Sequence, residues 1–171
     1  MRKIILNLAV SLDGYIEGPN GEFDWCFTDQ DYGMTDFLKS IDTIFFGRKS
    51  YDVLLAMDKN PYPDKAKYVF TENPDYIVKN AISVKIDPVK IKEIKELKGY
   101  HIWLFGGAEL FNKLLDMDLV DEIQLSVHPL VLGSGTSLFT KRHNIITFNA
   151  IGTKCYSSGL VQLTYNKPGI K

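Results

Sequence analysis

IWLFGGAELF, residues 102–111, carries the clearest structural signal in the chain. Residues 102–106 are apolar up to the first glycine, which is typical of a strand buried on both faces of a sheet. The residues that follow have apolar side chains at helical spacing: Leu110, Phe111, Leu114 and Leu115. We therefore expect a buried strand that passes into a helix over 108–115 through Gly106 and Gly107.

A strand that enters a helix through glycines can hold a phosphate group. Glycine has no Cβ, so the backbone can approach a ligand closely, and the first N–H groups of the helix attract an anion. About half of such turns are only tight connections, so this junction alone leaves both interpretations open.

Residues 43–51, TIFFGRKSY, repeat the same layout. Arg48 and Lys49 follow Gly47, and Ser50 can cap a helix expected over 51–57. A guanidinium, an ammonium and free N–H groups together suit a phosphate monoester. The alternative is a solvated basic pair. We favour the phosphate site, because the pair stands at the carboxyl end of an apolar strand.

The N-terminal segment also ends in a candidate ligand-binding loop. Residues 3–10 predict a central first strand, and residues 11–21 are rich in turn formers. In open α/β sheets, ligands bind at the carboxyl ends of the strands. Phe23 and Trp25 follow; they could stack on a flat ring or be buried against the core, and the sequence leaves both open.

Residues 28–40 predict a helix, with Thr28 as its cap and apolar Met34, Phe37 and Leu38 on one side. Asp31 stands one turn before Met34, so its side chain could project along the apolar face. A partly buried carboxyl group would have a raised pKa and could deliver a proton. The alternative is an acid that only caps the helix.

The remaining pattern defines the fold class. We expect strands over 67–70, 82–86 and 119–127, a helix over 89–97 begun by Asp87 and Pro88, and a hairpin of 145–156 with 160–165. Alternating strands and helices followed by strands alone predict one α/β domain, residues 1–171, with a mostly parallel sheet and an antiparallel edge. The Gly-Ser-Gly at 133–135 lacks a third glycine at dinucleotide spacing, so it is no Rossmann fingerprint.

Composition limits the functions to consider. The chain is 45% hydrophobic and 24% charged, with a net charge of −1, which argues against nucleic-acid or membrane-surface partners. No apolar run approaches the ~20 residues of a membrane helix, so we expect a soluble, cytoplasmic protein. Cys26 and Cys155 are expected to be reduced, although a single disulfide stays open. The histidines have no partners at metal-ligand spacing, so no metal site is expected: His101, His128 and His143.

Two phosphate-suited junctions, one with a monoester-type cation pair, suggest a dinucleotide with an additional phosphate, most commonly NADPH. The sequence resembles the dihydrofolate reductase-like superfamily, in particular the branch of the reductase domain of bacterial riboflavin biosynthesis. The resemblance rests on residues 9–16, 43–50, 105–111 and 119–139. It implies the three-layer dihydrofolate reductase-like fold with helices on both faces, NADPH as hydride donor, a flat heterocycle as acceptor, and a homodimer.

The resemblance also assigns site residues. It implies Ala9 and Ile16 beside the nicotinamide; Gly47, Arg48, Lys49 and Ser50 at the phosphate; Thr71 on the adenosine side; and Gly106, Gly107, Ala108, Glu109 and Leu110 at the pyrophosphate. Asp31 is the candidate catalytic acid, and Asp13 and Trp25 are the candidate substrate-binding residues. Dihydrofolate reductases place an Arg beyond the second helix for the folate tail, and this chain has none between Arg48 and Arg142, so folate as substrate stays open.

The expected function is an NADPH-dependent reductase of a small pterin- or pyrimidine-like heterocycle. Hydride would pass from the nicotinamide near Ala9 and Ile16, and Asp31 or a water would provide the proton. Two alternatives stay open: a nucleotide-binding module or sensor without turnover, and a purely structural interaction protein.

Overall fold

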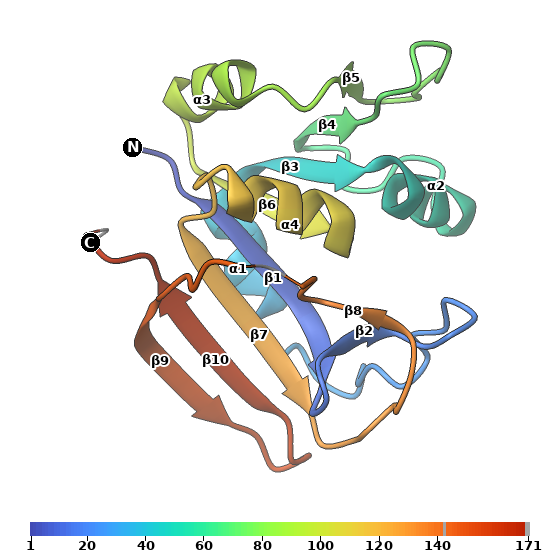
Figure 1. Cartoon of the computed structure of the whole chain (residues 1–171). Coiled ribbons are helices and arrows are strands. Elements are labelled where there is room, and N and C mark those ends of the chain that lie inside the picture. Colours follow the sequence, from blue (N-terminus) through green and yellow to red (C-terminus); the bar gives the residue numbers. More distant parts are fainter. Residues whose placement is uncertain (142, 170–171) are drawn as a thin grey trace.

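The computed structural model describes residues 1–141 and 143–169 and contains an eight-stranded sheet (Figure 1). In spatial order its strands are β5 (Ile82–Val84), β4 (Ala66–Phe70), β3 (Ile41–Gly47), β6 (His101–Gly106), β1 (Ile4–Ser11), β7 (Glu122–His128), β10 (Val161–Asn166) and β9 (Asn149–Cys155). All neighbours are parallel except β10, which is antiparallel to both β7 and β9. The predicted mostly parallel sheet with a C-terminal antiparallel hairpin is confirmed.

Helices cover both faces of the sheet, and Figure 1 shows α4 in front of it and α1 behind. One face carries α1 (Met34–Ser40) and α2 (Arg48–Met57), and the other carries α3 (Pro88–Glu96) and α4 (Ala108–Asp116). Successive residues of a strand point to opposite faces. In β1, Ile4 and Leu6 therefore pack in the cluster that contains Phe111 of α4, whereas Ile5 packs with Phe37 of α1. Burial on both faces explains the continuous apolar runs of these strands.

The start of α3 follows from its sequence. Pro88 occupies the first turn, where a missing N–H costs nothing, and Asp87 accepts a hydrogen bond from the Val89 N–H at 2.9 Å. This cap was predicted and is confirmed. Several strands are shorter than predicted: β5 ends at Val84, β7 begins at Glu122 and β9 begins at Asn149.

The prediction for the start of α1 was wrong. The helix begins at Met34 rather than at residue 28, with Gly33 as its N-cap residue, and Thr28 lies exposed in an irregular segment. Tyr32 and Gly33 have φ values of 51° and 82°, and a right-handed helix cannot continue through two left-handed residues. The apolar spacing extended the predicted helix past this break.

The prediction for the start of α2 also needs correction. The helix begins at Arg48 with Gly47 as N-cap residue, so Ser50 lies inside the first turn and does not cap it. Gly47 keeps the extended backbone of β3, with φ −71° and ψ 147°, and the chain turns directly after it. Arg48, Lys49 and Ser50 therefore carry the N–H groups that an α-helix leaves without intrahelical partners.

A small second sheet, which the sequence did not predict, joins two loops. β2 (Tyr15–Glu17) pairs with β8 (Thr136–Ser137), and the Thr136 hydroxyl donates to Glu17 Oε1 at 2.6 Å. A Cβ on Gly135 would collide with the carbonyl oxygen of Glu17. The glycine at 135 is thus required because the two strands approach each other there.

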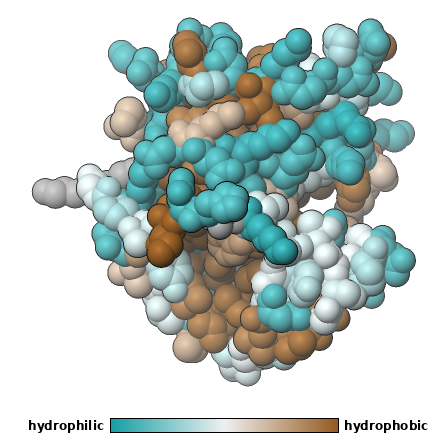
Figure 2. All heavy atoms as spheres, in the orientation of Figure 1, coloured by the Kyte–Doolittle hydropathy of each residue, from teal (hydrophilic) through white to brown (hydrophobic). Residues whose placement is uncertain are grey.

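The C-terminal hairpin leaves apolar surface uncovered on the α4 side. Leu125 of β7 stands opposite Leu163 of β10, and Val127 stands opposite Val161; all four are half-buried. Figure 2 shows apolar surface in the lower part of the molecule, where these strands lie. Every residue of the edge strand β9 is exposed. Among the residues described, no helix is long and apolar enough to cross a membrane.

Candidate functional site

The two strand–glycine–helix junctions lie side by side. β3 and β6 are parallel neighbours, with Phe46 opposite Gly106. A Cβ on Gly47 would lie 3.3 Å from the carbonyl oxygen of Gly106 and 3.7 Å from Cβ of Leu110. The first turns of α2 and α4 therefore start from adjacent strands at the same edge of the sheet, and two positive helix ends lie close together.

The glycine pair at 106–107 presents open backbone at this edge. Gly106 has φ +114°, and a Cβ there would meet no atom within 4 Å. A Cβ on Gly107 would lie 3.2 Å from Ser50 Oγ, so Ser50 of α2 touches the turn that leads into α4. The peptide bond between the two glycines is cis. Ala108 and Leu110 are buried behind this turn, whereas Glu109 is exposed.

The two cations of α2 have different surroundings. Arg48 Nη1 donates to Asp52 Oδ2 at 3.0 Å, and its guanidinium carbon lies 5.9 Å from the centre of the Tyr76 ring. Lys49 is exposed. The pKa of Glu109, at the start of α4, is lowered mainly by its hydrogen bond from Lys113, and the positive charge of Lys49 lowers it further.

Thr71 lies at the carboxyl end of β4, at the same edge. Its N–H donates to the Val84 carbonyl at 3.0 Å, and its hydroxyl accepts from the Asn73 N–H at 3.1 Å. The loop that follows is attached to α2 by the Tyr51 hydroxyl, which donates to the Lys79 carbonyl at 2.5 Å. The loop after β4 and α2 thus lie together on one side of the candidate site, at the carboxyl ends of the strands.

Ala9 and Ile16 stand near the carboxyl end of β1. Ala9 is half-buried in β1 opposite Ser126 of β7, and Ile16 in β2 is half-buried against the core cluster. The turn between the two strands is closed by the Gly14 N–H, which donates to the Ser11 carbonyl at 3.0 Å. Both residues are thus only partly covered by protein.

Asp13 is exposed, but its carboxylate is already occupied by protein groups. It accepts from the Ser11 hydroxyl at 2.7 Å and from the N–H groups of Leu132 and Gly133 at 3.1 and 2.7 Å. These bonds, the Ser11 bond foremost, lower the pKa of Asp13. Asp13 therefore holds the loop after β1 to the loop after β7.

Trp25 borders a hollow of about 560 Å³ that is lined by residues 24–29 and Ser158. It is half-buried: its Nε1 donates to the Glu22 carbonyl at 3.3 Å, and the centres of the Trp25 and His128 rings lie 5.2 Å apart in an edge-to-face contact. Phe23 is 42% exposed. Of the two aromatics, Trp25 is therefore packed against the protein yet still reachable from the hollow.

Of the two interpretations that the sequence left open for Asp31, the partly buried acid with a raised pKa is wrong. Its side chain is exposed, and Oδ1 accepts from the Thr35 hydroxyl at 2.6 Å and from the Thr35 N–H at 3.0 Å. These bonds lower the pKa of Asp31. Because Gly33 delays the start of α1, Asp31 precedes the apolar face instead of lying on it. It caps the first turn, which was the alternative interpretation.

His128 is a structural residue of the site that the sequence analysis missed. It is buried, with Nδ1 3.0 Å from the Ser126 carbonyl, and Nε2 accepts the Phe27 N–H at 3.0 Å. The rings of Trp25 and Phe27 meet it edge-on. Burial lowers the pKa of His128. Neutral His128 thus fixes the segment that borders the hollow; the only sequence signal was its place at the end of a strand.

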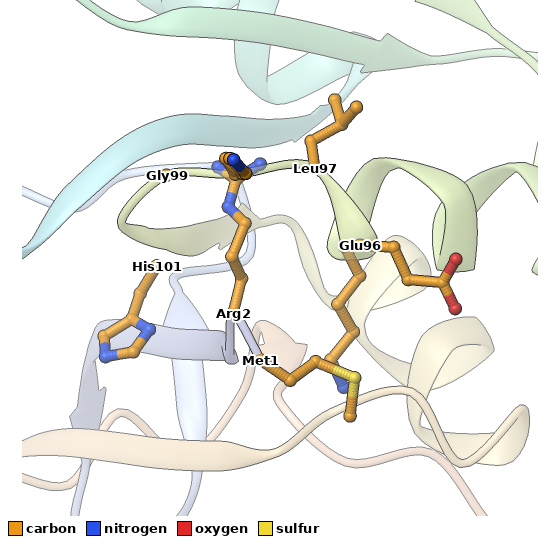
Figure 3. Close-up of a pocket in the computed structure, with 8 residues that line it drawn as sticks. Met1, Arg2, Glu96, Leu97, Gly99 and His101 are labelled. Carbon is orange, nitrogen blue, oxygen red and sulfur yellow. The ribbon is translucent and has the colours of Figure 1, made fainter.

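A second hollow, of about 440 Å³, lies at the opposite end of the sheet (Figure 3). Arg2 and His101 are among the residues that line it, at the N-terminal ends of β1 and β6. The Arg2 guanidinium donates to the carbonyls of Ile94 and Tyr100 and pairs with Asp42. Its role is therefore to connect chain segments, and ligands of parallel sheets bind at the other end.

The order and direction of the strands, with helices on both faces, define a dihydrofolate reductase-like α/β protein. The RibD C-terminal domain matches residues 2–161, and the chain belongs to this family. It is 44% identical to the uncharacterized protein YyaP of Bacillus subtilis, over 98% of this chain and 96% of that protein.

Solved structures show the same fold. A putative riboflavin biosynthesis protein from Shewanella sp. PV-4 is 30% identical, with a TM-score of 0.81 over 97% of this chain and 98% of that one. A dihydrofolate reductase from Enterococcus faecalis, solved with NADP(H), is 18% identical, with a TM-score of 0.73 over 97% of this chain and 96% of that one.

Proposed function

We propose that the protein is an NADPH-dependent reductase of a small pterin- or pyrimidine-like heterocycle. The observation that carries the proposal is the adjacency of the two helix N-termini at Gly47 and Gly106, with Arg48 and Lys49 on one of them. A pyrophosphate and a phosphate monoester need such donors. Membership of the RibD C-terminal domain family and the NADP(H) bound in the dihydrofolate reductase of the same fold support it.

The chain's residues suit the parts of this cofactor. The open backbone at Gly106 and Gly107 would receive the pyrophosphate, together with the N–H groups of residues 108–110. Residues 47–50 would bind the monoester phosphate, and Thr71 would border the adenosine. Ala9 and Ile16, both half-buried, would flank the nicotinamide and shield it from water.

The bound cofactor would supply a hydride to an electron-poor carbon of the heterocycle. The neighbouring nitrogen then needs one proton. Asp31 is ionised at neutral pH, like any carboxyl group with an ordinary or lowered pKa, so we propose that it orients a water that delivers the proton. Trp25 would stack on the heterocycle at the hollow, and Asp13 would keep the loops around it in place.

Replacing Arg48 by Ala tests the phosphate assignment. We expect the variant to lose at least about tenfold in NADPH affinity, which equals ~1.4 kcal/mol, because it removes a charge-assisted hydrogen bond to the phosphate. NADH affinity should change little. Lys90→Ala, on the exposed face of α3, is a control of equal charge change. Equal losses for NADPH and NADH would contradict the assignment.

A nucleotide-binding module without turnover is the second candidate. The observation that favours it is that Asp31, the acid expected to deliver the proton, is exposed and has a lowered pKa. If a substrate screen finds no NADPH oxidation while NADPH still binds, and Asp31→Asn leaves that affinity intact, this candidate replaces the reductase.

We also propose a cytoplasmic homodimer. The half-buried apolar pairs of β7 and β10, Leu125 with Leu163 and Val127 with Val161, form a face that a second copy would cover. Reduced thiols are expected in the cytoplasm, and Cys26 and Cys155 are both unpaired. Light scattering of the protein in solution measures the mass directly: twice 19.4 kDa supports the dimer, and the monomer mass refutes it.

A further inference from the structure

Arg48 belongs to a three-residue chain of contacts that the cofactor assignment alone does not explain. Asp52, one turn further along α2, accepts from Arg48 Nη1 through Oδ2 at 3.0 Å and from the Tyr76 hydroxyl through Oδ1 at 2.5 Å. The Tyr76 ring lies beneath the guanidinium, with 5.9 Å from its carbon to the ring centre. One carboxylate thus connects the candidate phosphate ligand to a residue of another segment.

Tyr76 can hold this position because its own loop is fixed. The Tyr51 hydroxyl donates to the Lys79 carbonyl at 2.5 Å, and the Tyr76 N–H donates to the Asn73 carbonyl at 3.3 Å. Tyr76 is half-buried. Burial and the bond to Asp52 both raise its pKa, so the phenol keeps its proton and donates to the carboxylate at neutral pH.

These contacts limit where the guanidinium can point. A free Arg side chain loses rotamer entropy when it is fixed in one orientation. In the described part of the chain, Nη1 is the guanidinium nitrogen that donates to protein, so the donors on Nε and Nη2 remain available for a phosphate. The guanidinium is therefore ordered before a phosphate arrives, and part of the ordering cost is removed from binding.

We propose that Asp52 and Tyr76 are positioning residues that determine the preference for a 2′-phosphorylated nucleotide by holding Arg48 between α2 and the loop after β4. The proposal rests on the proposed function, because it assumes that Arg48 binds the phosphate monoester. Asp52 and Tyr76 do not touch the ligand; they act through the guanidinium.

Two soluble nucleotides isolate this effect. Adenosine 2′,5′-bisphosphate and adenosine 5′-monophosphate differ only in the 2′-phosphate, so the ratio of their dissociation constants reports the monoester site. Calorimetric titration is done on the wild type, on Tyr76→Phe, which removes one hydroxyl, and on Asp52→Asn, which removes one charge. Tyr156→Phe, whose hydroxyl bonds to Gln162 on the C-terminal hairpin, is the matched control.

The wild type is expected to bind the bisphosphate at least about tenfold more tightly. Tyr76→Phe and Asp52→Asn should each lower that ratio by about 3- to 10-fold, the range of a typical net hydrogen-bond contribution, with the affinity for the monophosphate unchanged. Tyr156→Phe should keep the wild-type ratio. These results support the proposal.

Other outcomes would contradict either the cofactor site or only the positioning role of Asp52 and Tyr76. A wild type that does not distinguish the two nucleotides overturns the proposed cofactor site, and this inference with it. A wild type that does distinguish them, with a ratio unchanged or raised in both variants, overturns only the positioning role. Equal losses for both nucleotides also overturn it, because they indicate a general structural defect.

Discussion

Alanine at Gly135 should destabilise the protein far more than alanine at Gly133, two residues earlier in the same Gly-Ser-Gly segment. Both glycines have positive φ, +138° and +76°, so both substitutions strain the backbone. A Cβ at Gly133 would meet nothing within 4 Å, whereas a Cβ at Gly135 would collide with the Glu17 carbonyl oxygen and lie 3.0 Å from Gly18 Cα. The pair therefore separates backbone strain from steric conflict.

The expected loss of unfolding free energy in each variant follows from the surroundings of its glycine. Gly133→Ala costs only the left-handed conformation, about 1 kcal/mol. Gly135→Ala adds backbone strain of ~1–3 kcal/mol to an overpacking cost of similar size, because β2 must move away from β8. These two contributions sum to about 2–6 kcal/mol, and we expect about 3 kcal/mol. At this chain length, 1 kcal/mol shifts the melting temperature by about 2–4 °C.

Thermal unfolding of both variants, followed by circular dichroism, measures the difference. We expect a fall of about 2–4 °C for Gly133→Ala and about 6–12 °C for Gly135→Ala. Because Ile16 lies in β2, Gly135→Ala should also weaken NADPH binding. If the two variants melt within about 1 °C of each other, the close approach of Gly135 to β2 does not matter for stability, and backbone strain alone accounts for both losses.

Two further outcomes concern titratable side chains. Burial lowers the pKa of His128, so below about pH 6.5 the unfolded chain binds more protons than the folded chain, and the free energy of unfolding falls as the pH falls. The loss of unfolding free energy between pH 7.5 and 5, measured by denaturant titration, should therefore be smaller in His128→Gln than in the wild type. An equal loss in both would contradict this. The pKa of Asp13 is lowered by its hydrogen bonds to Ser11, Gly133 and Leu132. Asp13→Asn removes the charged acceptor of the Leu132 and Gly133 N–H groups, so these two amides should exchange hydrogen faster. Unchanged exchange would show that the carboxylate does not hold that loop.

The central fold and the phosphate edge could be predicted because their signals are local. Each buried strand is a continuous apolar run, and each junction adds a glycine and a helical pattern within ten residues. The sequence placed both junctions on one sheet, but it did not predict that they are neighbours; the parallel pairing of β3 and β6 shows this.

The parts that could not be predicted depend on contacts between distant or backbone groups. His128 binds the Phe27 N–H across 101 residues, and Asp13 binds two backbone N–H groups that leave no trace in the side-chain sequence. β8 has two residues, too few to show the alternation of apolar and polar side chains by which a strand is predicted. The start of α1, and with it the position of Asp31, was mispredicted because the left-handed Tyr32 and Gly33 interrupt an apolar pattern that is otherwise typical of a helix.

The most direct test of the proposed function is a titration of the wild-type protein with NADPH and NADH, followed by tryptophan fluorescence. Trp25 borders the hollow, whereas Trp103 is buried in the core, so a change is expected mainly from Trp25. We expect NADPH to bind at least about tenfold more tightly than NADH, a difference of ~1.4 kcal/mol. Binding of neither nucleotide, or equal binding of both, would contradict it.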